Sequence, residues 1–174
     1  DEFLKRLSHI QSLFLEKNVP VVNLLSLWTD MDHTSYVDYI TDGEPVVPSL
    51  YAQMFRSKTS EPTVFPDDPN KLPDDPNKPG YLKISEHTAA IAAAFGIGAD
   101  DADRLRADPW VIEDDNLTLD NLSRLYRHSL LARIVELPIR QYLMTLRLIA
   151  KDPFTPIPNQ IDMPTALLNR FDLM

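Results

Sequence analysis

Residues Leu117–Phe154 read LTLDNLSRLYRHSLLARIVELPIRQYLMTLRLIAKDPF, and this stretch decides the fold. Its apolar side chains recur at the three- and four-residue spacing of an amphipathic α-helix. Thr118 is a suitable N-cap for a first helix, which we expect to run to about Glu136. Pro138 then opens a second helix, because a proline in the first helical turn sacrifices no hydrogen bond. The stretch therefore predicts a helical hairpin.

A more divergent copy of this hairpin begins the chain. A shift of 118 residues aligns Pro20 with Pro138 and Leu25 with Leu143, and the prolines coincide at the junction between two helices. The first helix of this copy is predicted over about Glu2–Lys17, and the second runs from Pro20 through Trp28. A hairpin of this kind cannot bury its apolar face alone, so a repeat predicts neighbours on both sides.

Three shorter helices are predicted between the two hairpins. The first spans Ser49–Arg56 and has Ser49 as its N-cap. Ser85 is predicted to cap an alanine-rich helix that Gly96 terminates. A third helix, Asp100–Arg106, places its acidic residues first and its basic residues last, as the helix dipole favours.

The remaining segments are predicted to be connections. Glu61–Gly80 contains six prolines in twenty residues and repeats PDDPNK at 66–71 and 73–78, which is typical of a low-complexity surface loop. Trp110–Ile112 is predicted to be a buried anchor within an acidic connector. Glu113–Asp115, at the end of that connector, is interpreted as a solvated turn.

These elements predict an all-α protein, an irregular array of helical hairpins with a long Pro/Asp-rich surface loop. We divide it into an N-terminal hairpin with short helices (1–60), the loop (61–80), a helical segment with the second hairpin (81–154) and a C-terminal extension (155–174). The chain begins at Asp1 and ends on an incomplete helical pattern, ALLNRFDLM. We interpret it as one domain or as a fragment of a longer polypeptide.

The composition of the chain argues against several classes of function. The net charge of −9 argues against general binding to nucleic acid or to anionic membranes. The absence of cysteine excludes disulfides and thiol chemistry. No apolar run approaches the roughly 20 residues of a membrane-spanning helix. The N-terminal pattern is that of an amphipathic helix and not of a signal peptide.

Motifs for catalysis or cofactor binding are weak, and we predict no enzyme, no cofactor and no metal site. Asp30, Asp32 and His33 could ligate a metal, but their spacing matches no standard signature, and a structural turn is the preferred interpretation. Gly96 and Gly98 lack the third glycine and the preceding strand of a phosphate-binding loop.

The histidines and arginines do not form a recognisable site in the sequence. The four histidines lie far apart, and no serine sits in a GxSxG motif. The arginines of the second hairpin are distributed around both helices beside acids, as solvated helix faces usually show. The four histidines are His9, His33, His87 and His128. The arginines of the second hairpin are Arg124, Arg127, Arg133, Arg140 and Arg147.

The chain resembles one known family over roughly Leu24–Phe154. The runs NLTLDNLSRLYRHSLLAR from Asn116, LLSLW from Leu24, SLYAQMF from Ser49 and ISEHTAAIAAAFGI from Ile84 occur in the same order in the A component of Tc insecticidal toxin complexes. The related plasmid virulence A proteins of enteric bacteria share such segments. The duplicated PDDPNK loop and the C-terminal extension depart from the pattern.

The resemblance implies a structural role outside the cell. The A component is a secreted, pentameric, bell-shaped assembly that binds host cells and inserts a channel, through which cargo held by the B and C components passes. This chain would be part of the helical shell around that channel, with other segments of its own subunit and sister subunits as partners. The residues predicted to pack between helices are Leu122, Leu125, Tyr126, Leu131, Ile139, Leu143 and Leu146.

Two alternatives remain open. One is a free-standing helical adaptor whose groove or Pro/Asp-rich loop binds another protein. The other is a metal-dependent enzyme at Asp30, Asp32 and His33.

Overall fold

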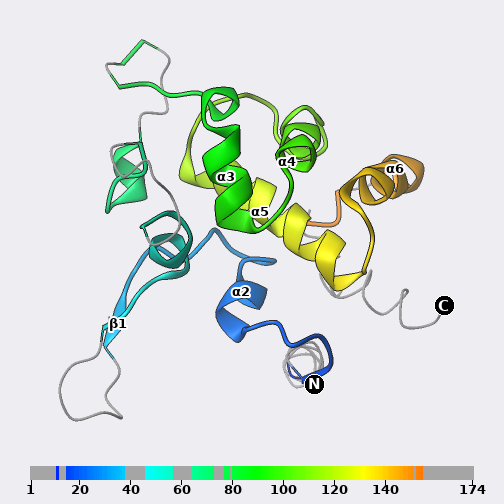
Figure 1. Ribbon diagram of the computed structural model, residues 1–174, viewed down its shortest axis with the longest axis horizontal. Helices are drawn as coiled ribbons and strands as arrows, with labels where there is room; N and C mark the ends of the chain where they lie inside the picture. The colour runs from blue at the N-terminus through cyan, green and yellow to red at the C-terminus, as the bar shows by residue number, and fades with distance from the viewer. Residues whose placement is uncertain are drawn as a thin grey trace, which may run out of the picture.

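The computed structural model describes Gln11 and residues 15–37, 46–56, 64–72, 77–78, 80–150 and 152–154. Most of the described chain is helical, which confirms the all-α class in its coarse form (Figure 1). The predicted helix over Glu2–Lys17 lies largely outside the described residues, apart from Gln11 and Leu15–Lys17, which are helical. The predicted C-terminal extension, 155–174, also lies outside them.

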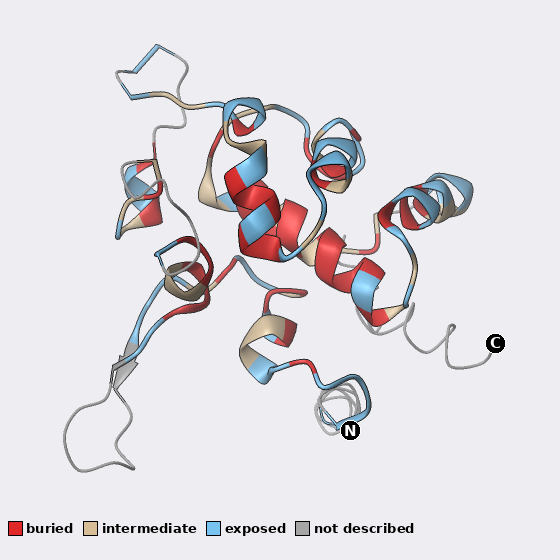
Figure 2. Ribbon diagram, viewed as in Figure 1, coloured by how far each residue is buried: buried red, intermediate tan, exposed pale blue. Residues whose placement is uncertain are grey.

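Helix α5 (Leu119–Ile134) is the centre of the fold. Of its 16 residues 11 are buried, so other segments cover it on nearly every side (Figure 2). The Thr118 hydroxyl accepts a hydrogen bond from the Asn121 N–H at 3.2 Å, which confirms the predicted N-cap. The position of α5 explains why the hairpin sequence decides the fold: the neighbouring elements pack against this one helix.

Helices α3 (Thr88–Phe95) and α4 (Ala99–Arg106) cover α5 on one side (Figure 1). Gly96 follows α3 in the left-handed conformation, at φ +71°, and so ends the helix as predicted. The predicted cap at Ser85 is wrong. Ser85 belongs to a 3-10 turn, η3 (Ile84–Glu86), and its hydroxyl donates to a carboxylate oxygen of Asp115.

Helix α6 (Ile139–Ile149) follows α5 after a short junction and buries one face. Its buried residues are Ile139, Tyr142, Leu143 and Leu146. Helix α2 (Val21–Leu25), the predicted counterpart of α6, is only five residues long and does not continue to Trp28. The chain turns after Leu25 and buries Leu27 and Met31 in the core instead.

The segment between the hairpins contains a small sheet that the sequence did not predict. Strands β1 (Tyr36–Val37) and β2 (Val46–Val47) pair antiparallel, with Tyr36 opposite Val47. The predicted helix over Ser49–Arg56 is present but ends as a π-helix, η1 (Ala52–Arg56). The Ser49 hydroxyl accepts from the Ala52 N–H at 3.2 Å, as expected of a cap.

The described part of the Pro/Asp-rich segment is more than a surface loop. A 3-10 turn, η2 (Pro69–Lys71), is capped by the Asp68 side chain. Phe65 is fully buried and stacks on Phe55 with ring centroids 4.5 Å apart, and Leu72 is also buried. These apolar side chains fix this part of the segment to the core, so the surface-loop prediction is wrong for them.

The acidic connector before α5 also differs from expectation. Val111 and Ile112 are buried as predicted, but Trp110 is 36% exposed, so it is not part of a buried anchor. Asp114 is not merely solvated, because its carboxylate accepts hydrogen bonds from the Asn116 N–H at 3.0 Å and the Asn121 side-chain amide at 2.7 Å. The connector is thereby fixed to the first turn of α5.

Candidate interaction site

The two proline junctions have the same backbone conformation. Asn18 and Glu136 both adopt positive φ, at 51° and 57°. Two residues later, Pro20 has φ −56° and ψ 143°, and Pro138 has φ −55° and ψ 142°. A left-handed residue ends one helix and an extended proline begins the next. The repeat inferred from the aligned prolines is therefore present at the junctions, although α2 is shorter than α6.

The two junctions also lie close together. The Lys17 ammonium and a Glu136 carboxylate oxygen are 2.9 Å apart, and this hydrogen bond and charge lower the pKa of Glu136. The Asn23 amide, just after Pro20, donates to the Tyr126 hydroxyl at 2.5 Å. A hollow of about 520 Å³ lies between the junctions and is lined by charged and amide side chains of both. We regard it as the place where the two junctions meet, because an ion pair joins them there.

All seven residues predicted to pack between helices lie in the buried core. None is more than 6% exposed, and Leu122 is completely buried. Those on α5 are Leu122, Leu125, Tyr126 and Leu131, and those on α6 are Ile139, Leu143 and Leu146. Phe95 of α3 contacts Tyr126 with ring centroids 5.2 Å apart, so this set reaches the other helices as well.

A buried polar pair, His128 and Tyr142, connects α5 to α6. The His128 Nδ1 and the Tyr142 hydroxyl are 2.8 Å apart, and the Phe154 ring packs edge-on to the imidazole with centroids 4.8 Å apart. The pKa of His128 is lowered to about 3, chiefly by burial and to a smaller extent by the nearby Arg127 and Arg124 guanidinium groups. Burial likewise raises the pKa of Tyr142. Both groups are therefore neutral at physiological pH.

The sequence did not predict this pair, although the position of His128 in α5 indicates it. His128 lies three residues after Leu125 and three before Leu131, so it belongs to the apolar face of α5. An uncharged imidazole can occupy such a position when a neighbour supplies a hydrogen bond. Tyr142, on the buried face of α6, is that neighbour.

The three residues considered as metal ligands have separate partners. An Asp30 carboxylate oxygen lies 3.1 Å from Arg127 Nη2. Asp32 accepts from the Thr34 N–H at 3.1 Å, and His33 Nε2 lies 3.1 Å from the Asn70 side-chain amide. Within the described residues no three His, Asp or Glu side chains are grouped in a way that could hold a metal.

Several arginines were predicted to lie on solvated helix faces. In the structure they form hydrogen bonds or ion pairs with other segments of the chain. The Arg127 side chain is only 14% exposed, and its guanidinium lies 5.6 Å from the Phe154 ring centroid. Arg124 donates from Nε to the Val111 carbonyl at 2.9 Å. Arg147 of α6 pairs with Asp108, which follows α4, at 2.7 Å. That aspartate is only 1% exposed, so the pair fixes α6 against the end of α4.

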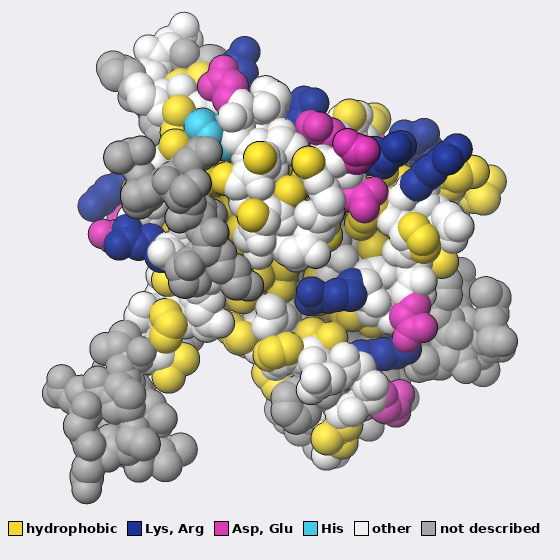
Figure 3. All heavy atoms as spheres, viewed as in Figure 1, with side chains coloured by type: hydrophobic (Ala, Val, Ile, Leu, Met, Phe, Trp, Pro, Cys, Tyr) yellow, Lys and Arg dark blue, Asp and Glu magenta, His cyan; other side chains and the backbone are white. Residues whose placement is uncertain are grey.

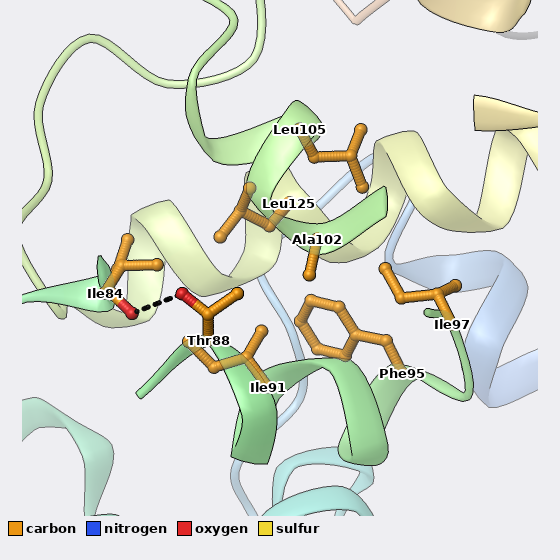
Figure 4. A pocket seen from close by; sticks show the side chains of 8 residues that line it. All are labelled: Ile84, Thr88, Ile91, Phe95, Ile97, Ala102, Leu105 and Leu125. Carbon is orange, nitrogen blue, oxygen red and sulfur yellow. Dashed lines mark hydrogen bonds between the residues drawn. The ribbon is translucent and has the colours of Figure 1, made fainter. Parts of the chain in front are cut away.

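A small apolar hollow between α3, α4 and α5 offers no ligand site. Ile84, Ile91, Phe95 and Leu105 point into it, together with Leu125 from α5 (Figure 4). The space between these side chains cannot hold a water molecule. It is part of the packed core.

The face of α6 that points away from the core is a further candidate for an interaction. Met144 and Leu148, one helical turn apart, are 55% and 86% exposed. Arg140 and Arg147 lie on the same face of the helix. In the described part of the chain, no helix is both long enough and apolar enough to cross a membrane.

Comparisons of the chain with models of protein families, with curated proteins and with solved structures gave no match.

Proposed function

We propose that this chain is a structural part of the helical shell of a Tc-toxin A-type subunit, secreted and without catalytic activity. The resemblance of the four ordered sequence runs suggests the family. The observation that carries the structural role is the repeated junction at Asn18–Pro20 and Glu136–Pro138, with matching dihedral angles and an ion pair between the copies. A repeated junction of this kind suits an element that packs against copies of itself.

The burial of polar groups supports a packing role over a catalytic one. His128 and Tyr142 are directed at each other inside the core, and Asp108 is neutralised by Arg147. In this proposal these groups set how α4, α5 and α6 pack. The partners are neighbouring segments of the same subunit, sister subunits, the B and C components and the host-cell surface.

The proposal is tested on the parent gene and its product. We expect a reading frame far longer than this chain, adjacent genes for B and C components, and large bell-shaped particles of the purified product in negative-stain electron microscopy. A stop codon soon after Met174, with a small monomeric product, would exclude the toxin role and favour the free-standing helical adaptor.

The metal-dependent alternative has its own test. Elemental analysis of protein purified without chelators or dialysis should find no stoichiometric metal. A bound metal that is lost in an Asp32→Asn variant would revive that alternative.

A further inference from the structure

The outward face of α6 carries an apolar pair bordered by positive charge. Leu148 is 86% exposed and Met144 is 55% exposed, the two highest exposed fractions among the large hydrophobic side chains of α3 to α6. The face also carries Arg140, and Arg147 keeps 61% of its side chain exposed. Figure 3 shows basic side chains beside hydrophobic ones at the edge of the molecule where α6 lies. We call Arg140, Met144, Arg147 and Leu148 the α6 outer face.

The α6 outer face is held rigidly by the core behind it. Tyr142 contacts His128, and Arg147 pairs with the buried Asp108. Leu143 and Leu146 are buried between these contacts. A surface that is fixed before binding loses little conformational entropy when a partner docks.

We propose that the α6 outer face binds an acidic amphipathic helix of another protein chain. Two apolar side chains one helical turn apart form a ridge that fits between the side chains of a second helix. Arg140 has no acidic partner among the described residues, and Arg147 has only Asp108. A carboxylate flanking the apolar stripe of the incoming helix would complement the Arg140 charge, while Arg147 stays paired with Asp108.

Other occupants fit the surface less well. Among helices α2 to α6, none presents carboxylates beside an exposed, large apolar stripe; in the acidic helix α4 the large apolar residue, Leu105, is buried. A second copy therefore lacks the required surface there. An anionic membrane fits less well, because two apolar side chains offer it little area to insert.

The probe for this site is a fluorescently labelled helical peptide of about 18 residues, built from Ala, Leu and Glu with one leucine stripe. Its binding to the intact chain is measured by fluorescence anisotropy. We expect Leu148→Glu to weaken binding about tenfold, because the ridge loses its most exposed apolar contact. We expect Arg140→Glu to weaken it several-fold, and added salt to weaken it further.

Three controls separate this site from non-specific association. A peptide with Lys in place of every Glu should bind at least about tenfold more weakly. The variant Leu15→Glu changes an exposed leucine that is not part of the α6 outer face and should bind the acidic peptide as wild type does. Circular dichroism confirms that each variant is folded.

Four results would overturn the proposal. These are no binding of the acidic peptide, equal binding of both peptides, binding that Leu148→Glu leaves unchanged, and capture by vesicles containing phosphatidylserine that Arg140→Glu abolishes. Self-association that Leu148→Glu removes, seen by analytical ultracentrifugation, would assign the face to a second copy instead. The inference rests on α6 alone and holds for a shell segment or an adaptor, so its failure leaves the proposed function standing.

Discussion

The buried histidine predicts how the stability of this protein depends on pH. His128 is completely buried, and its pKa in the folded protein is lowered from 6.5 to about 3. The unfolded chain binds a proton at His128 below about pH 6.5, whereas the folded chain does not until about pH 3. The contribution of this histidine to stability is therefore complete above pH 6.5 and is lost as the pH falls towards 3.

The size of the effect follows from the difference between the two pKa values. Each pH unit between them changes the free energy of unfolding by about 1.4 kcal/mol. Between about pH 8 and about pH 4.5, His128 should therefore remove roughly 3 kcal/mol of stability. The lower pH is well above the folded-state pKa, so this figure hardly changes if that pKa is about one unit higher.

The assay compares urea unfolding of the wild type and of His128→Gln at both pH values. Carboxylates and the other histidines contribute equally to both proteins, so the difference between the two pH responses isolates His128. We expect the variant to lose roughly 3 kcal/mol less than the wild type on acidification. His33→Gln, at an exposed position, should keep the wild-type response.

An equal loss of stability in wild type and His128→Gln would refute this reasoning. If that variant does not fold, the His128 ring resonances of the wild type give an independent test by NMR. They should show no titration as the pH is lowered from about 8 to about 4.5. A midpoint near pH 6.5 would show that the imidazole is accessible to solvent, which would contradict its burial beside Tyr142.

Three further expectations concern stability and are measured by urea or thermal unfolding. Leu146→Ala should cost about 2–5 kcal/mol, whereas Leu148→Ala, two residues along α6, should cost less than about 0.5 kcal/mol, because Leu146 is 3% and Leu148 86% exposed. Gly96→Ala should cost about 1 kcal/mol from its φ of +71° alone, since no atom lies within 4 Å of an added Cβ; no loss would contradict the left-handed conformation. Arg147→Met should cost more than Arg140→Met, because only Arg147 neutralises the buried Asp108; equal costs would argue against the ion pair.

Local signals in the sequence located most of the helices and several of their ends. The Thr118 cap, the stop at Gly96 and the opening of α6 after Pro138 all depend on the conformational preferences of single residues. The conformational preference of proline also explains why aligning Pro20 with Pro138 identifies two junctions with the same dihedral angles. These features need no information from distant parts of the chain.

Features that depend on distant partners differ from what the sequence predicts. Ser85 resembles an N-cap, but Asp115, thirty residues away, binds its hydroxyl. Trp110 resembles a core residue because of its size, yet Val111 and Ile112 occupy the interior instead. In the Pro/Asp-rich segment, Phe65 is buried because Phe55 provides a stacking surface that proline content cannot reveal.

The sequence by itself determined the helical class, the central hairpin and its apolar faces, because helical periodicity and caps act within a few residues. Only the tertiary structure decided that α5 is enclosed on nearly every side, that His128 is neutral beside Tyr142, and that Asp108 is buried under Arg147. The physical reason is that burial and charge pairing depend on which segments meet, and the meeting groups here lie 14 and 39 residues apart in the chain. The same packing leaves Met144 and Leu148 exposed on α6.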